Sequence, residues 1–130
     1  MNQIIKTILA VSISLSTSVL FAAPKVLITH NTTDFESNGF VSGTIPSQTP
    51  TKAHTDGKVF WATVKLACFG HIVNNKCPAL IKMKTDTAEP VELGYVEMDV
   101  TTGIITPSEL HANGFTMIVN GPGETTLIKD

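Results

Sequence analysis

Arginine is absent from this sequence, and charge of either sign is sparse. The nine basic residues are all lysines, against eleven acidic residues, and charged residues make up 15% of the chain. Proteins that bind duplex nucleic acid need a basic face and commonly use arginine to contact phosphates and base edges. The formal net charge of −2 therefore predicts no nucleic-acid partner. The hydrophobic share of 42% excludes a disordered chain, and 130 residues leave room for one domain.

A long hydrophobic run occurs only at the N-terminus, where it predicts a cleaved signal peptide over residues 1–22. The apolar stretch, residues 7–21, is about 15 residues long, whereas a transmembrane helix needs about 20. Lys6 precedes it, as in bacterial signals, and Ala22 supplies the small residue before the cleavage site. We therefore expect residues 23–130 to form a single exported domain, periplasmic or extracellular, with no membrane contact after cleavage.

Cysteine occurs only twice, as Cys68 and Cys77, and an even pair in an exported protein predicts a disulfide. The nine-position separation argues against a redox couple, which usually has two residues between its cysteines, and a cysteine-rich metal site needs four ligands. Asn74 and Asn75 tolerate a positive φ and favour a tight turn between the two cysteines. The pair is therefore expected to clasp a β-hairpin or its loop.

Alternating apolar and polar residues predict that the mature chain is built from β-strands. The alternation is clearest over residues 58–69, where every second residue from Phe60 to Cys68 is apolar and Trp61 belongs to the opposite face. In residues 91–100 it changes phase at Gly94, which is typical of a β-bulge. Further strands are expected at residues 25–31, 40–45, 79–84, 115–119 and 125–129.

One short helical turn is expected near residues 107–113. Thr106 can cap a helix, Pro107 fits the first helical position, and Glu109 completes a capping box, while Gly114 suits the end of the turn. The remaining pattern of short strands separated by regular turn signals predicts a mainly β fold. We expect a small antiparallel β-sandwich of the immunoglobulin-like or a similar type.

Familiar catalytic motifs are missing: the sequence contains no Gly-x-Ser-x-Gly, no His-Glu-x-x-His, and no phosphate or dinucleotide loop. The four histidines lie in separate segments, and the methionines of the mature chain follow the strand pattern, which is typical of core filling. A site that the fold assembles from His54, His71 and Asp56 stays open as an alternative. We predict a non-enzymatic protein with no catalytic residues, no bound metal and no cofactor.

A family resemblance is carried by residues 70–77, GHIVNNKC, and residues 91–96, VELGYV. Together they resemble the early part of chaperone–usher fimbrial subunits, which have glycine, two apolar residues and asparagine before a cysteine, and then Val-x-Leu-Gly-x-Val. The resemblance implies an incomplete immunoglobulin-like sandwich that a neighbour's strand completes. The fimbrial partner cysteine lies well downstream, whereas here Cys68 lies upstream.

Two polar loops are the candidate recognition surfaces: residues 46–57, rich in proline and threonine, and the closing loop 120–124. A loop of about a dozen residues without secondary structure is uncommon in a small domain unless it is mobile or used. Its ionisable side chains, together with the lone tryptophan of the neighbouring strand, are the possible partner contacts: Lys52, His54, Asp56 and Trp61.

The sequence as a whole favours a small exported, disulfide-clasped β-domain that acts as a binding or interaction module. Its mildly acidic mature chain favours a protein or glycan partner over nucleic acid or an anionic membrane. Two alternatives stay open, a structural surface protein similar to fimbrial subunits and an exported protein that handles metal.

Overall fold

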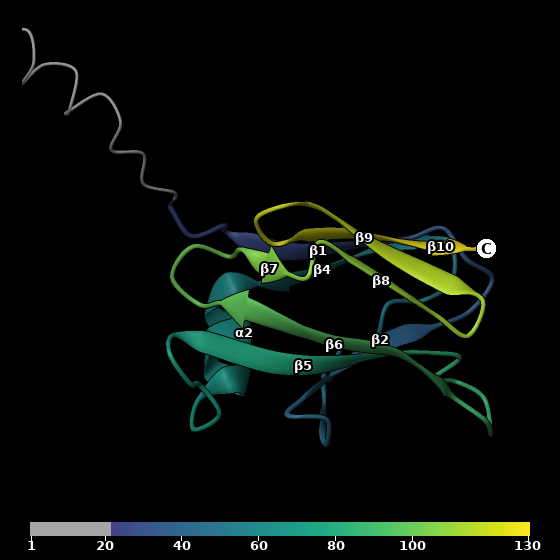
Figure 1. Cartoon of the computed structure of the whole chain (residues 1–130), viewed down its shortest axis with the longest axis horizontal. Helices are drawn as coiled ribbons and strands as arrows, with labels where there is room; N and C mark the ends of the chain where they lie inside the picture. Colours follow the sequence, from purple (N-terminus) through teal and green to yellow (C-terminus); the bar gives the residue numbers. More distant parts are fainter. Residues whose placement is uncertain (1–21) are drawn as a thin grey trace, which may run out of the picture.

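Two five-stranded β-sheets face each other in the computed structural model, which describes residues 22–130 (Figure 1). Except for Ala22, the predicted signal peptide lies outside the described residues. The first sheet has the strand order β4-β1-β10-β9-β8 and the second the order β3-β2-β5-β6-β7. The mainly β sandwich predicted from the sequence is therefore confirmed. The elements are β1 (Val26–Asn31), β2 (Ser37–Val41), β3 (Ile45–Pro46), β4 (Thr55–Phe60), α2 (Trp61–Cys68), β5 (Lys76–Met83), β6 (Val91–Asp99), β7 (Ile105–Thr106), β8 (Glu109–Ala112), β9 (Phe115–Gly121) and β10 (Glu124–Lys129).

The strands pair antiparallel in both sheets with one exception. β1 lies between β4 and β10, and it runs antiparallel to β4 but parallel to β10, with Ile28 opposite Glu124 and Asn31 opposite Leu127. The first and last strands of the domain are thus neighbours in the centre of the first sheet. The expected antiparallel sandwich holds for every other described strand pair.

Residues 61–68 form the helix α2, so the strand predicted over 58–69 is correct only as far as Phe60. The apolar residues of this segment fit both periods, because Trp61, Val64 and Cys68 lie at helical spacing and are the buried residues of α2. β1 begins at Val26, which pairs with Phe60. β4 therefore loses its strand partner at Phe60, and α2 begins at the next residue. Alanine, leucine and lysine fill most remaining positions, and they are favourable helix formers.

The short helical turn predicted near residues 107–113 is wrong, because Glu109–Ala112 form the strand β8 instead. β8 pairs antiparallel with β9, and Ala112 lies opposite Phe115 across the turn. Asn113 and Gly114 both have positive φ, +55° and +84°, which is the two-residue hairpin turn that an Asn-Gly pair favours. The hairpin signal therefore outweighs the capping box at Thr106 to Glu109.

The predicted disulfide between Cys68 and Cys77 is present, and both cysteines are fully buried. It joins the last residue of α2 to β5, so it crosses a helix–strand connection and not a pair of strands. The turn predicted at Asn74 and Asn75 is confirmed, with positive φ at both residues and two backbone hydrogen bonds between Val73 and Lys76. The disulfide thereby attaches the helix to the second sheet.

The hydrophobic core lies between the two sheets and against the inner face of α2. The predicted bulge near Gly94 is confirmed by a register shift between β5 and β6 and by the φ of +144° at this glycine. Within residues 22–130, no helix has both the length and the apolar composition needed to cross a bilayer. The buried hydrophobic residues are Val41, Trp61, Val64, Cys68, Cys77, Ala79, Leu80, Met83, Leu93, Val96, Met98, Val100, Ile105, Phe115, Met117 and Leu127.

Candidate binding site between the sheets

A cavity of about 580 Å³ extends into the sandwich between the two sheets. One wall is formed by residues of the first sheet, such as Met117 and Leu127, and the other by residues of the second, such as Ala79 and Val96. Side chains of α2, including Val64, close one end. The space is open to solvent at one side, and the wall residues Ala79, Val96, Met117 and Leu127 are at most 4% exposed.

Small side chains and the edges of the sheets leave this space open. β3 and β4 are the edge strands of the two sheets, and both line the cavity. Gly39, Gly57, Ala67 and Ala79 contribute little side-chain volume to its walls. The segment that connects β3 to β4 crosses from the second sheet to the first, and its residues 47–49 border the cavity. The opening therefore lies between α2, this connection and the two edge strands.

The chemistry of the lining changes from the interior to the opening. The interior residues named above are apolar, whereas serine, threonine, asparagine and glutamine side chains gather along 37–38 and 47–51. Among the described residues that line the cavity, Lys58 is the one charged residue, and its side chain is exposed. Sites with apolar walls and a few polar groups at one end bind small molecules that have the same division.

Large apolar side chains at the opening are exposed to solvent. Phe60 and Leu66 both line the cavity, yet 73% and 76% of their surfaces are accessible. Ile45 of β3 also lines it and is 40% exposed. Exposed apolar residues that continue into an apolar cavity are typical of a ligand entrance.

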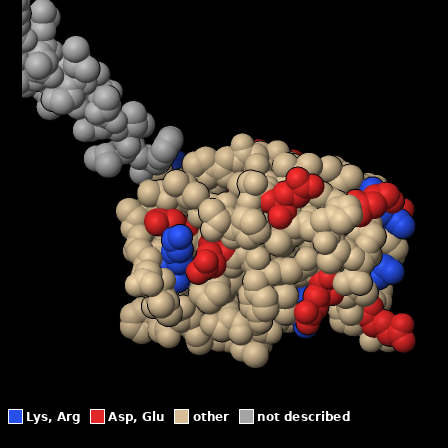
Figure 2. Space-filling view, viewed as in Figure 1, with Lys and Arg blue, Asp and Glu red and all other residues tan. Residues whose placement is uncertain are grey.

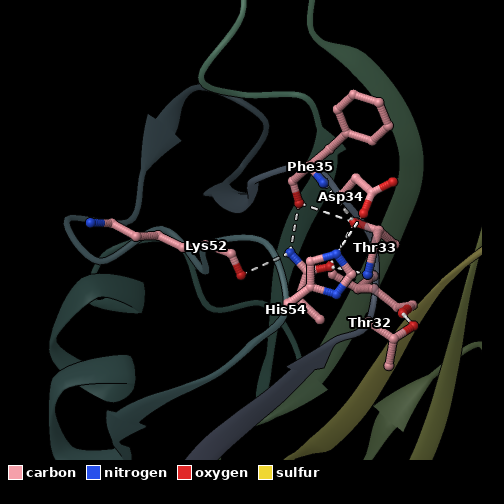
Figure 3. A network of polar contacts seen from close by, with 8 residues as sticks. Thr32, Thr33, Asp34, Phe35, Lys52 and His54 are labelled. Carbon is pink, nitrogen blue, oxygen red and sulfur yellow. Dashed lines mark hydrogen bonds and ion pairs between the residues drawn. The ribbon is translucent and has the colours of Figure 1, made fainter.

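The connection between β3 and β4 is fixed in place by a network of polar contacts (Figure 3). The side-chain amide of Asn31 donates hydrogen bonds to the backbone oxygens of Phe35 at 2.7 Å, Lys52 at 3.2 Å and Thr51 at 3.3 Å. Ser37 and Thr51 exchange two backbone hydrogen bonds, of 2.8 and 2.9 Å. The loop predicted at residues 46–57 is present but shorter, because Pro46 belongs to β3 and residues 55–57 belong to β4. Its backbone at Thr51 and Lys52 is held by the buried Asn31, a contact that sequence patterns cannot reveal.

The predicted contact residues of this loop do not form one site. Lys52 is exposed, and in Figure 3 its side chain points away from His54. His54 pairs with Asp34 through its Nε2 atom at 2.5 Å, whereas Asp56 pairs with a different histidine in β1. Each of the three side chains thus has its own surroundings.

Trp61 and His71 also lie apart from that loop. Trp61 is 4% exposed, and its indole N–H donates a hydrogen bond of 3.0 Å to the backbone oxygen of Val100, so the side chain belongs to the core. The Nδ1 atom of His71 lies 3.2 Å from the hydroxyl of Ser42. The histidine site left open at the sequence level is therefore not assembled, and no group of three or more histidine, cysteine, aspartate or glutamate residues in 22–130 has the arrangement of a metal site.

A cluster that the sequence did not indicate lies across the first sheet. The Nδ1 atom of His30 is 2.8 Å from Asp56, and its Nε2 atom is 2.7 Å from Glu124. The hydrogen bond to Asp56 and, second, the one to Glu124 raise the pKa of His30 above its ordinary value of 6.5. The three residues belong to β1, β4 and β10, so the cluster links the central parallel pair to the edge strand.

Local sequence patterns could not have identified the cavity. Its lining residues come from nine different strands, from α2 and from the connection between β3 and β4. The one available signal was Lys58, a cation followed directly by the apolar residues Val59 and Phe60 at a strand end.

The known proteins to which this chain is similar point to one family. The model of the family described as T2SS substrate NttC matches residues 1–130. The crystal structure of the Legionella pneumophila type II secretion system substrate NttC has a TM-score of 0.81 and 52% sequence identity, covering 83% of this chain and 100% of that chain. No curated protein sequence matches this chain. The expected exported, disulfide-containing β-domain agrees with this match, whereas the fimbrial resemblance is not what the family model supports. The chain belongs to the NttC family of type II secretion substrates.

Proposed function

We propose that this protein is an exported, non-enzymatic binding module that holds the apolar chain of an amphiphilic ligand between its two sheets. The observation that carries the proposal is the 580 Å³ cavity with apolar walls. Its volume lies within the range of about 300–1,000 Å³ that small-molecule sites occupy. Export through a type II secretion system, as described for the similar NttC protein, is part of the same proposal.

The charge at the opening favours an anionic head group on the ligand. Lys58 of the edge strand β4 is among the residues that line the cavity, and no carboxylate is among them. Strand alternation places its side chain on the same face of β4 as Asp56. An apolar chain in the interior would leave a carboxylate or phosphate group near this ammonium, where both charges stay hydrated. A single-chain anionic amphiphile, such as a fatty acid, fits this arrangement.

The positions of the histidines support binding over catalysis. None of the four histidines lines the cavity, and three of them, His30, His54 and His111, are paired with carboxylates at other places. The walls therefore offer hydrophobic contact and one ammonium group, which suit retention of a ligand. The protein or glycan partner expected at residues 46–57 stays a prediction, and exposed Lys52 and His54 are the side chains it would contact.

A binding measurement with cavity variants tests the proposal. Ala79 is buried in the cavity wall, and Ala79→Phe places a ring in the space that the acyl chain would occupy. We expect the affinity for hexadecanoate, measured by calorimetry, to fall by about tenfold or more, since several methylene contacts are lost at about 0.8 kcal/mol each. The control Ala88→Phe makes the same change at an exposed position outside the cavity and should bind as the wild type does.

The head-group contact is tested with a charge reversal. Lys58→Glu should weaken binding of hexadecanoate but leave binding of the uncharged hexadecanol unchanged, because only the acid has a charge to repel. Lys129→Glu reverses an exposed lysine that does not line the cavity and should affect neither ligand. Absence of binding to both ligands in the folded wild type would contradict the proposed function.

A further inference from the structure

The outer face of α2 is apolar and has no partner in the described chain. Trp61, Val64 and Cys68 cover the inner face, which leaves Leu66 near the centre of the outer face. Leu66 is 76% exposed, and Phe69, three positions later, is 81% exposed. Phe69 directly follows the last residue of α2, so the two exposed apolar side chains lie near the same end of the helix.

Two further apolar groups flank α2. Phe60, which immediately precedes α2, is 73% exposed, and Val73, in the hairpin turn after it, is 67% exposed. We call Phe60, Leu66, Phe69 and Val73 the α2 patch. Single exposed apolar residues need no explanation, but several on one short helix and its flanks mark a contact surface.

Lysines outnumber acids in the segment that carries the α2 patch. Residues 57–75 contain Lys58 and Lys65 and no acid, although the whole chain has a net charge of −2. The carboxylate of Asp99 lies near the end of this segment, where it accepts a hydrogen bond from the side chain of Asn75. Lys65 lies on α2 itself, and Lys58 lies at the cavity opening beside Phe60.

Apolar side chains flanked by lysines, without acids, are complementary to an anionic lipid surface. Figure 2 shows acidic and basic side chains side by side on the face that it draws. A protein partner would more commonly be met by mixed charges and hydrogen-bonding groups at the rim of the patch. The lysines near the α2 patch favour a lipid surface there, whereas the net charge of the whole chain favours a protein or glycan partner.

From this arrangement we infer that the α2 patch docks on anionic lipid surfaces. The patch is continuous with the cavity opening through Phe60 and Leu66, which belong to both. Docking would bring the opening to the head-group region, from which a single acyl chain could enter without crossing water. The docking itself does not rest on the proposed function, because Phe69 and Val73 do not line the cavity and the contacts of the patch with lipid form with or without a bound ligand.

Vesicle co-sedimentation tests the inference directly. The full mature protein is mixed with vesicles of phosphatidylcholine alone or of phosphatidylcholine with phosphatidylglycerol. We expect clear binding to the anionic vesicles, weaker binding to the neutral ones, and a decline with rising salt. Leu66→Ser together with Phe69→Ser should weaken binding at least about tenfold, because two apolar contacts with the lipid are lost.

Matched variants separate docking from loss of folding. Ile128→Ser removes an exposed apolar residue of β10 and should bind as the wild type does. Phe60 lies opposite the first residue of β1, whereas Ile128 lies next to Leu127, which is opposite the last residue of β1. Lys65→Glu should weaken binding to anionic vesicles by roughly tenfold, whereas Lys129→Glu should not. Circular dichroism checks that each variant is folded.

Three outcomes would overturn the docking proposal. They are the absence of wild-type binding to anionic vesicles at low salt, equal binding by the patch variants, and a patch-dependent dimer in solution that does not bind vesicles. Ala79→Phe distinguishes the two proposals, because it should lose hexadecanoate but keep vesicle binding. If docking fails while hexadecanoate still binds, the cavity function stands without this surface.

Discussion

Two polar side chains connect neighbouring elements at single points. The imidazole of His30 is held between Asp56 and Glu124, and it thereby joins three strands of the first sheet. The indole of Trp61 connects α2 to the backbone of Val100, just after β6. The His30 contacts depend on the protonation of the imidazole, so a pH titration tests them. The Trp61 contact lies in the core, so fluorescence and denaturant unfolding test it.

The His30 cluster predicts a stability that depends on pH. The raised pKa of His30 means that the folded state favours the protonated form. Its contribution is fully present below 6.5 and is lost as the pH rises through the higher pKa of the folded protein. We expect Tm to fall between about pH 6 and pH 8 in the wild type and to fall less in His30→Gln.

Removing the main cause of the shift provides the control. Asp56→Asn takes away the hydrogen bond that contributes most to the raised pKa, and it should remove most of the pH dependence that His30→Gln removes. Equal slopes of Tm against pH in the wild type and both variants would show that protonation of His30 does not stabilise the folded protein.

Trp61 predicts a fluorescence signal for the closed end of the sandwich. Because the side chain is 4% exposed, its emission should be blue-shifted in the folded protein and shift to the red in denaturant. Trp61→Phe leaves the Val100 oxygen without its donor and should lower the free energy of unfolding by about 1–3 kcal/mol. Emission at the water-exposed limit in the native protein would contradict the packing of α2.

At the scale of elements, the disulfide determines where α2 lies. It holds the end of the helix against β5, and the helix in turn borders the cavity. Cys68→Ala together with Cys77→Ala should lower the free energy of unfolding by about 2–3 kcal/mol, as expected for a short closed loop. Denaturant titration measures the change, and a reducing agent should lower the wild-type midpoint without affecting the double variant.

Sequence patterns predicted most strands but misassigned two elements for identifiable reasons. Residues 61–68 carry an apolar pattern that fits both a strand and a helix, and β1, which begins at Val26 opposite Phe60, offers no strand partner to residues after Phe60. At residues 109–114, a capping box and an Asn-Gly hairpin turn compete, and pairing with β9 favours the hairpin. Both decisions depend on tertiary partners, which a local pattern does not contain.

At the scale of the whole molecule, the cavity arises from the relation between two sheets. The disulfide and the Asn74–Asn75 turn were predictable because their partners are close in sequence. The cavity and the His30 cluster were not, since His30 and Glu124 are 94 positions apart and the cavity walls come from both sheets. Helix α2 and the connection between β3 and β4 then leave an opening beside the α2 patch.

A crystal structure of the mature protein with saturating hexadecanoate tests the central claim most directly. We expect the acyl chain to lie between the sheets against Ala79, Val96 and Met117, with its carboxylate near the ammonium group of Lys58. The two sheets should keep their separation, because the cavity is already present without a ligand. Hexadecanoate bound only outside the sandwich, or a cavity closed by core side chains in the crystal, would contradict the account.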